Sequence, residues 1–109
     1  MNPIDFNGLD TAVHGPIRLG IMTGLQVDGP LDFTTLKKRL DTADGSLNLH
    51  LGKLEECGYI ISKKAFVALR PKTTYRITPT ARKALTNYLQ SMKSLIEYLE
   101  LMKGKGKSS

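Results

Sequence analysis

The segment from Asp44 to Ile61 constrains the fold of this chain more than any other, because it carries signals for where a helix starts and stops. Asp44 is a suitable N-cap, since its carboxylate can accept a backbone N–H of the first helical turn. Gly58 supplies the C′ position, where a residue that tolerates positive φ readily ends a helix. Between them, three leucines fall at the spacing of one helical face: Leu47, Leu51 and Leu54. The segment therefore predicts a helix over residues 44–57 that leads directly into a strand.

A second capped helix precedes this one, with Asp32 as its N-cap. Its apolar face consists of Phe33, Leu36 and Leu40. Only residues 41–43 link the two helices, and two short helices joined by such a turn form a helix-turn-helix. A further helix is expected upstream, from Pro16 to the helix-breaking sequence at 28–30. After that break, Leu31 can form a strand of one or two residues.

A β-hairpin is expected after the helix-turn-helix. Residues 59–66 and 73–78 are rich in β-forming side chains and partly alternate between apolar and polar. The loop between them is 67–72, and we place Pro71 at its tip because proline cannot donate a ladder hydrogen bond. The sequence thus predicts a wing, centred on residues 62–76, beside the helix-turn-helix.

A long helix closes the predicted fold. Thr78 and Pro79 suit the N-cap and the first helical position, and no glycine or proline follows until Gly104. A helix over residues 79–103 would be roughly 37 Å long at about 1.5 Å per residue. Its apolar seam consists of Leu85, Leu89, Met92, Ile96, Leu99 and Met102. Because such a helix outruns the body of a small domain, we expect this seam to form a dimer interface.

The composition is that of one folded domain, with 109 residues and 40% apolar content. No apolar run approaches the roughly 20 residues that a membrane-spanning helix needs. Residues 1–10 lack the hydrophobic stretch of a signal peptide, and the single cysteine excludes an internal disulfide framework. We therefore expect a cytoplasmic protein with no membrane partner.

The net charge of +6 is unevenly distributed along the chain. Residues 57–96 contain eight bases and no acid, so they carry +8. The rest of the chain has eight bases against ten acids and carries −2. A solvated surface normally mixes the two signs, so a basic face without a partner is the less favoured alternative. The simplest explanation of this segregation is a polyanionic partner.

Three pieces of the sequence resemble the small winged helix-turn-helix regulators of bacteria and archaea that are related to the MarR and ArsR repressors. They are residues 14–21, 45–60 and 70–79, which read HGPIRLGI, GSLNLHLGKLEECGYI and RPKTTYRITP. With their spacing they cover residues 9 to about 102, which is nearly the whole chain.

The resemblance implies an α+β, mainly helical winged helix-turn-helix with a two-stranded wing and a long C-terminal dimerisation helix. Its parts are an N-terminal arm over 1–13, the DNA-binding domain over 14–78, the dimerisation helix over 79–103 and a disordered tail over 104–109. The function it implies is a homodimeric transcriptional regulator, which we expect to be a repressor of double-stranded operator DNA. The helix at 44–57 would lie in the major groove, and the wing would follow the backbone or the minor groove.

The candidate DNA-binding residues are Ser46, Asn48, Leu49, His50 and Lys53 of the helix, and Lys63, Lys64, Arg70, Lys72 and Arg76 of the wing. Asn48 can pair with an adenine edge. Arg70 and Lys72 can reach phosphates or a narrow minor groove, whereas some of the strand cations can face solvent without a role. Leu49 either meets a thymine methyl group or is an ordinary exposed leucine. Gly52 replaces the polar or basic residue expected of such regulators, which leaves the degree of sequence specificity open.

Metal binding and catalysis are not expected. His14, His50 and Cys57 lack the closely spaced partners that a metal site requires, so no metal or other cofactor is predicted. We expect His50 to pack against the helix-turn-helix or touch a phosphate, and Cys57 to be a small core residue. No phosphate loop or nucleophile with a base is present, so the chain is not expected to be an enzyme. An architectural DNA-binding protein and a winged helix for protein–protein contact remain alternatives, and the sequence does not indicate whether an effector exists.

Overall fold

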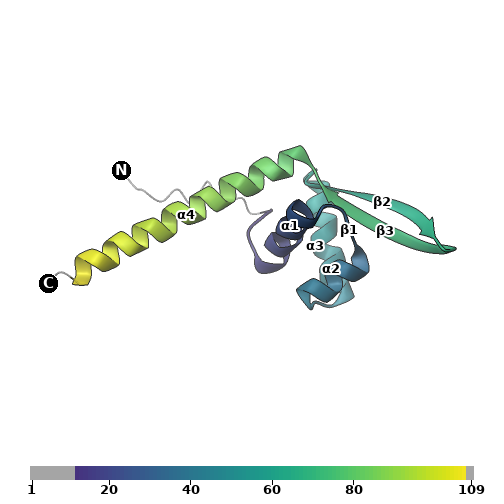
Figure 1. Cartoon of the computed structure of the whole chain (residues 1–109), viewed down its shortest axis with the longest axis horizontal. Helices are drawn as coiled ribbons and strands as arrows, with labels where there is room; N and C mark the ends of the chain where they lie inside the picture. The colour runs from purple at the N-terminus through teal and green to yellow at the C-terminus, as the bar shows by residue number, and fades with distance from the viewer. Residues whose placement is uncertain (1–11, 108–109) are drawn as a thin grey trace.

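A computed structural model describes residues 12–107 and shows, within that range, four helices and a three-stranded antiparallel sheet. In chain order the elements are α1 (Pro16–Asp28), β1 (Leu31–Asp32), α2 (Phe33–Leu40), α3 (Asp44–Glu56), β2 (Ile60–Val67), β3 (Arg70–Ile77) and α4 (Pro79–Lys107). Figure 1 shows α1, α2 and α3 packed together, with the β2–β3 hairpin projecting to one side and α4 to the other. The predicted fold class, α+β and mainly helical with a wing, is confirmed.

The helix-turn-helix forms as predicted, with one local difference. Asp32 caps α2 by accepting the backbone N–H of Thr35 at 3.0 Å. Asp44 does not cap α3, because Ala43 holds the N-cap position without a side-chain hydrogen bond and Asp44 is the first helical residue. The Asp44 carboxylate instead lies 2.7 Å from Nζ of Lys37 on α2. This ion pair links the two helices and keeps a negative charge at the N-terminus of α3, where the helix dipole favours it.

The sheet has the strand order β1-β3-β2, so β3 is the central strand. The strand predicted at Leu31 is β1, which pairs with the inner end of β3 through Leu31 and Tyr75. It makes no pairing with the outer half of β3. Beyond β1 the sheet is therefore a two-stranded ribbon that projects from the domain.

The hairpin turn is tighter than the predicted loop over 67–72. Its two residues are Ala68 and Leu69, both with positive φ, and the strands pair right up to them. Pro71 therefore lies within β3, opposite Phe66, and not at the tip. Proline is tolerated there because β1 does not reach this part of β3, which leaves one side of the strand without a neighbour.

The core lies between the three helices α1, α2 and α3, the inner end of the hairpin and the first turns of α4. Its fully buried large side chains include Ile21, Met22, Leu25, Leu36, Leu47, Leu51, Leu54 and Leu85. This confirms the predicted inner face of α3. Val13 is also fully buried, so the arm predicted over 1–13 ends inside the core, and residues 1–11 lie outside the described part of the chain.

Thr78 begins α4 as predicted and also joins it to the end of α3. Its hydroxyl oxygen accepts the backbone N–H of Ala81 at 3.2 Å, which is the capping bond. The same hydroxyl donates to the carbonyl oxygen of Gly58 at 2.8 Å. Gly58 follows α3 with a φ of 74°, as predicted for its C′ position. One side chain thus fixes the start of α4 against the end of α3.

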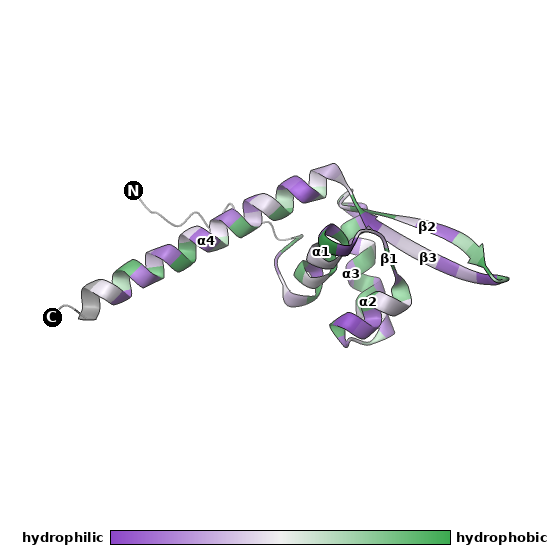
Figure 2. Ribbon diagram, viewed as in Figure 1, coloured by the Kyte–Doolittle hydropathy of each residue, from purple (hydrophilic) through white to green (hydrophobic). Residues whose placement is uncertain are grey.

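α4 continues past Gly104 to Lys107, so it is longer than predicted and residues 104–107 belong to it, not to a tail. A glycine lowers helix propensity by about 1 kcal/mol relative to alanine, which does not by itself end a helix. Leu85 is only 1% exposed and belongs to the core of its own chain, so its assignment to a dimer interface is wrong. Met92 is half-buried and packs against the same core. The other predicted seam residues, Leu89, Ile96, Leu99 and Met102, are exposed. Figure 2 shows apolar and polar bands alternating along the part of α4 that leaves the body.

Candidate nucleic-acid interface

The outer face of α3 presents most of the residues predicted for DNA contact. Asn48, Leu49, Gly52 and Lys53 are exposed, whereas Ser46 is half-buried. Leu49 is 59% exposed although it lies in the middle of a helix that buries three other leucines. The pattern follows from helical geometry, since the side opposite the core-facing leucines must face solvent.

A groove of about 660 Å³ lies between the helices α2 and α3 and the β2–β3 hairpin. Asn48 of α3 lines it on one side, and Lys64, Pro71 and Thr73 of the hairpin line it on the other. Glu55 also lines the groove, so its walls are not uniformly cationic. The groove brings one predicted base-reading residue, Asn48, and two predicted DNA-binding cations, Lys64 and Lys72, together in one place.

The strand cations are divided between the two faces of the hairpin, because successive residues of a strand point to opposite sides. Lys64 lies on the groove face. Lys63 and Arg76 line a cavity of about 560 Å³ on the opposite face, together with Ala65 and Thr74. The sequence grouped these three cations, and the structure separates them.

Arg70 and Lys72 do not flank the tip as predicted, because the turn lies at Ala68 and Leu69. Arg70 is exposed and directly follows the turn. Lys72 lies further along β3, with its Nζ 3.6 Å from an Oδ of Asp32. The hydrogen bond from Thr35 is the main cause that lowers the pKa of Asp32, and the charge of Lys72 adds to it. The positive charge of Lys72 is therefore partly balanced within the chain.

His50 is half-buried beside α1, in agreement with the packing role predicted for it. Arg18 of α1 donates its Nε–H to Nδ1 of His50 at 3.1 Å. A ring that accepts at Nδ1 carries its proton on Nε2, and that nitrogen is a donor. Burial lowers the pKa of His50, and the charges of Arg18 and Lys53 lower it further, so the ring is neutral at pH 7. Sequence reasoning missed Arg18, although it is the only basic residue of α1.

The depressed pKa of His50 makes the stability of the fold sensitive to pH. In the unfolded chain the group titrates near 6.5, so below that pH the unfolded state binds more protons than the folded state. The free energy of unfolding should therefore decrease as the pH falls below 6.5, until the folded-state pKa is passed. Urea denaturation at about pH 7.5 and about pH 5.5 measures this change. His50→Gln should reduce the difference between the two pH values, and an undiminished difference would contradict the assignment.

Cys57 is exposed, so the prediction that it is a small core residue is wrong. α3 ends at Glu56, and Cys57 therefore leaves the helical face that buries Leu54. His14 is hydrogen-bonded to Tyr88, with 2.9 Å between Nδ1 and the phenol oxygen. Within residues 12–107, no three His, Cys, Asp or Glu side chains are placed to hold a metal ion. No helix in that same range is long and apolar enough to span a bilayer.

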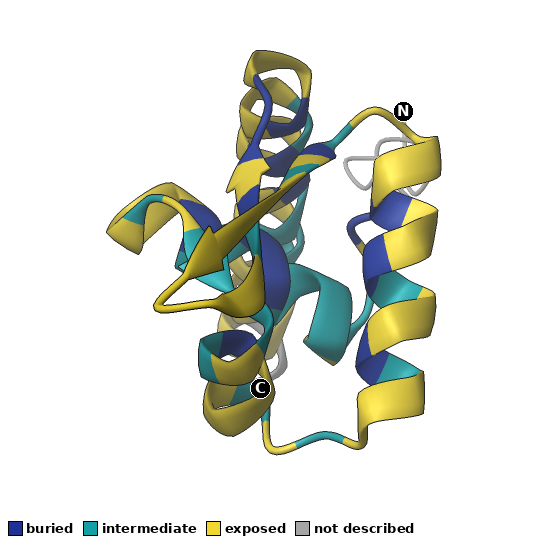
Figure 3. Cartoon of the chain, turned by 90° about the vertical axis from the view of Figure 1, so that its right-hand side faces the viewer, coloured by how far each residue is buried: buried dark blue, intermediate teal, exposed yellow. Residues whose placement is uncertain are grey.

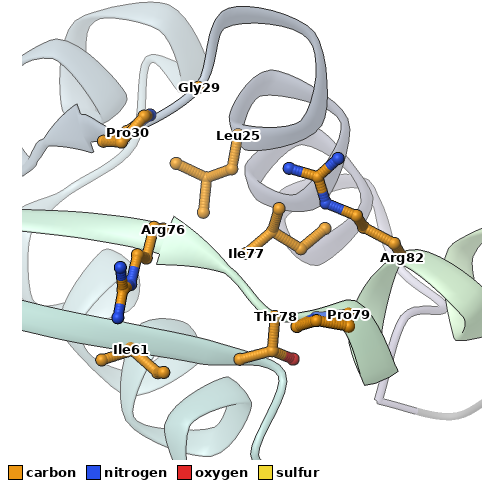
Figure 4. Close-up of a pocket in the computed structure, with 9 residues that line it drawn as sticks. All are labelled: Leu25, Gly29, Pro30, Ile61, Arg76, Ile77, Thr78, Pro79 and Arg82. Carbon is orange, nitrogen blue, oxygen red and sulfur yellow. The ribbon is translucent and has the colours of Figure 1, made fainter.

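Another cavity, of about 420 Å³, lies where the end of α1, the inner end of the hairpin and the start of α4 meet (Figure 4). Leu25, Ile61 and Ile77 form its apolar part. Arg76 and Arg82 line it from β3 and α4, and their guanidinium groups lie well apart in Figure 4. Arg76 thus faces this junction and not the groove beside α3.

Comparison with known proteins identifies the domain. Residues 17–96 match the family model of a winged helix DNA-binding domain. An uncharacterized protein of Methanocaldococcus jannaschii is 38% identical over 82 residues, which is 75% of this chain and 86% of that protein. A transcriptional regulator homologue from Pyrococcus horikoshii OT3 superposes with a TM-score of 0.75 at 33% identity, covering 81% of this chain and 87% of its own. An ArsR family transcriptional regulator superposes with a TM-score of 0.59 at 27% identity, covering 84% and 89%.

The family match covers most of the chain and includes the helix-turn-helix, the hairpin and the greater part of α4. The resemblance to winged helix-turn-helix regulators, first drawn from three short sequence pieces, is confirmed by these matches. The chain belongs to the family of winged helix DNA-binding domains.

Proposed function

We propose that this chain is a homodimeric transcriptional regulator, with α3 of each protomer in the major groove and the β2–β3 hairpin on the DNA backbone or in the minor groove. One observation carries the proposal. The exposed face of α3 and the cationic hairpin border the same groove, so a single duplex can meet both. Residues 57–96 carry a charge of +8, and two of their bases, Lys64 and Lys72, line that groove. This positive charge favours a polyanionic partner.

In this arrangement α3 supplies the base contacts. Asn48 is exposed and lines the groove, and an asparagine amide can pair with both hydrogen-bonding atoms of an adenine edge. Leu49 is proposed to meet a thymine methyl group, and its exposure on the outer face of α3 supports this contact. Lys53 is exposed one turn further along and is suited to a phosphate.

His50 is proposed to bind the backbone through Nε2. The bond from Arg18 orients the ring and keeps the proton on the nitrogen that is not engaged. A neutral imidazole N–H can then donate to a phosphate oxygen, while Arg18 adds a cation beside the same contact. Arg18 is in this view a positioning residue for His50.

Dimerisation is proposed to depend on α4 beyond the core. Leu89, Ile96, Leu99 and Met102 are each 46–57% exposed, which is unusual for a seam of large apolar side chains on a helix of 29 residues. Burying this seam against the same seam of a second protomer produces a twofold axis. Because Thr78 fixes α4 against the end of α3, that axis also sets the separation of the two recognition helices. A dimer seated on its operator excludes other proteins from that DNA, which is the basis for proposing repression.

Selection of bound fragments from the source genome, followed by substitution of Asn48, tests the proposal. Asn48→Ala is expected to weaken binding to the selected fragment by about 1–3 kcal/mol at one base pair, which is about fivefold to 150-fold, and to affect mixed-sequence DNA much less. Competition gel shifts measure the ratio. Asn87→Ala, at an exposed position on α4, is the matched control and should change neither affinity.

An architectural DNA-binding protein is the second candidate, and Gly52 favours it because no side chain at this exposed position of α3 can read a base. In that case Asn48→Ala would reduce the affinity for every duplex equally, and no fragment would be enriched in the selection. Absence of any DNA binding by the wild-type chain would contradict both candidates.

A further inference from the structure

The tip of the β2–β3 hairpin is apolar and almost fully exposed. Leu69 is 96% exposed, Phe66 79% and Val67 54%. Figure 2 shows the outer end of β2 in the hydrophobic colour, and in Figure 3 the outer hairpin has the colour of exposed residues. Large apolar side chains that are exposed together commonly mark an interaction site, whereas single exposed ones need no explanation. This tip therefore differs from the rest of the hairpin, which carries cations.

The turn at the tip has a sequence that its backbone does not favour. Ala68 has a φ of 52° and Leu69 a φ of 66°, so both lie in the left-handed region of a two-residue hairpin turn. Asparagine and glycine are the residues that such turns prefer, and a bulky residue at positive φ is an outlier. Strained backbone of this kind is concentrated at functional sites. Both the positive φ of Leu69 and the exposure of its apolar side chain to water are unfavourable. The presence of leucine at this position therefore indicates a role for that side chain.

The cations around the tip indicate what the apolar residues meet. Lys63, Lys64 and Arg70 lie within a few residues of the turn, and no acid occurs between 57 and 96. Phe66 is on the same face as Lys64, because the two are alternate residues of β2, and that face borders the groove beside α3. The apolar tip is thus followed along the strands by positive charge, which complements a duplex with anionic backbones on either side of stacked bases.

We propose that the hairpin tip is a wedge, in which Leu69 and Phe66 enter the minor groove and part a base step, so that binding kinks the duplex. Apolar side chains of this type unstack bases and bend DNA in minor-groove proteins on other folds. The flanking cations hold the two backbones while the wedge is inserted. This inference rests on the proposed DNA-binding function. It adds that the protein bends the DNA and that the hairpin tip causes the bend.

The test uses a variant that improves the turn and removes the wedge. Ala68→Asn with Leu69→Gly installs the preferred turn residues, so the hairpin should fold at least as well. The probe is a mixed-sequence duplex with 2-aminopurine at a TA step, a step that is easily unstacked. Wild-type protein should raise the 2-aminopurine fluorescence, and it should speed ligase-driven circularisation of duplexes shorter than about 150 base pairs.

Both effects should be lost in the double variant, while the affinity for the duplex changes by less than about threefold, because unstacking offsets much of what insertion gains. Phe66→Thr keeps a β-forming residue and should lose most of the fluorescence increase, which provides a second measurement if the turn variant does not fold. Val27→Gln is the control, since Val27 is 80% exposed on α1 and is not part of the hairpin. It should retain both effects.

Each of the other outcomes is decisive. If a folded turn variant and Phe66→Thr keep the fluorescence increase and the circularisation, the wedge is wrong and DNA binding stands. If wild-type protein does not bind the duplex at all, the proposed function is wrong and the wedge with it. If wild-type protein binds the duplex without raising the 2-aminopurine fluorescence, the wedge is wrong. If it also sediments with phosphatidylglycerol vesicles, the tip is instead a lipid-binding element.

Discussion

Ile96→Glu combined with Leu99→Glu is expected to give a monomer that binds DNA about 10²- to 10⁴-fold more weakly than the wild-type chain. Both side chains are more than half exposed on the part of α4 that projects from the body. Four like charges in a twofold seam would oppose pairing, and each protomer would then bind with one recognition helix only. Two half-sites about 34 Å apart, one turn of DNA, can be engaged together only by a dimer.

Light scattering, circular dichroism and gel shifts on the same sample check this expectation. The core of the chain ends near Tyr88, so the variant should keep its helical content and its winged helix. Asn87→Glu with Ser94→Glu adds the same charge to the opposite, exposed side of α4 and should remain dimeric. A folded Ile96→Glu, Leu99→Glu variant that stays dimeric would place the interface elsewhere.

The affinity for DNA is expected to fall by about 10³- to 10⁵-fold between about 50 mM and about 200 mM salt. If a dimer neutralises about six to ten phosphates, a plot of the logarithm of the binding constant against the logarithm of the salt concentration has a slope close in magnitude to that number. The structure ranks the contributors within the hairpin. Arg70 is exposed beside the turn, whereas Lys72 lies 3.6 Å from an Oδ of Asp32 and is already partly balanced.

Arg70→Ala should therefore reduce the slope by about two per dimer, and Lys72→Ala should reduce it by less. Both changes should weaken binding to selected and mixed-sequence DNA alike, since phosphate contacts carry no sequence information. Lys93→Ala on the exposed side of α4 is the control and should leave the slope unchanged. A flat salt response of the wild-type chain would contradict backbone contact by the hairpin.

The order of the helices and strands, and the residues at which most of them begin and end, depend on short-range interactions and were predictable from the sequence. Asp32 caps α2, Gly58 ends α3 at positive φ, and Thr78 starts α4, because each of these needs only the side chain and its near neighbours in the chain. The leucine spacing of α3 similarly determined which face is buried and which residues, Asn48 among them, remain for a partner.

What the sequence could not determine depends on contacts between segments that are distant in the chain. Asp44 is the first residue of α3 and pairs with Lys37 of the neighbouring helix, and Lys72 is balanced by Asp32 only after β1 pairs with β3. The bond from Arg18 that orients His50 joins residues 32 positions apart. Local propensity carries no information on such pairs.

The hairpin shows the difference most clearly. The sequence indicated a proline-centred loop over 67–72, because proline disfavours a paired strand. The tertiary structure shows β1 ending before it meets Pro71, so the proline fits an unpaired edge and the turn moves to Ala68 and Leu69. Sequence alone thus determined that a cationic hairpin follows the recognition helix. Only the tertiary structure decided that the turn lies at the apolar residues Ala68 and Leu69, because β1 ends before Pro71 and so leaves the edge of β3 opposite β2 open for a residue without an N–H.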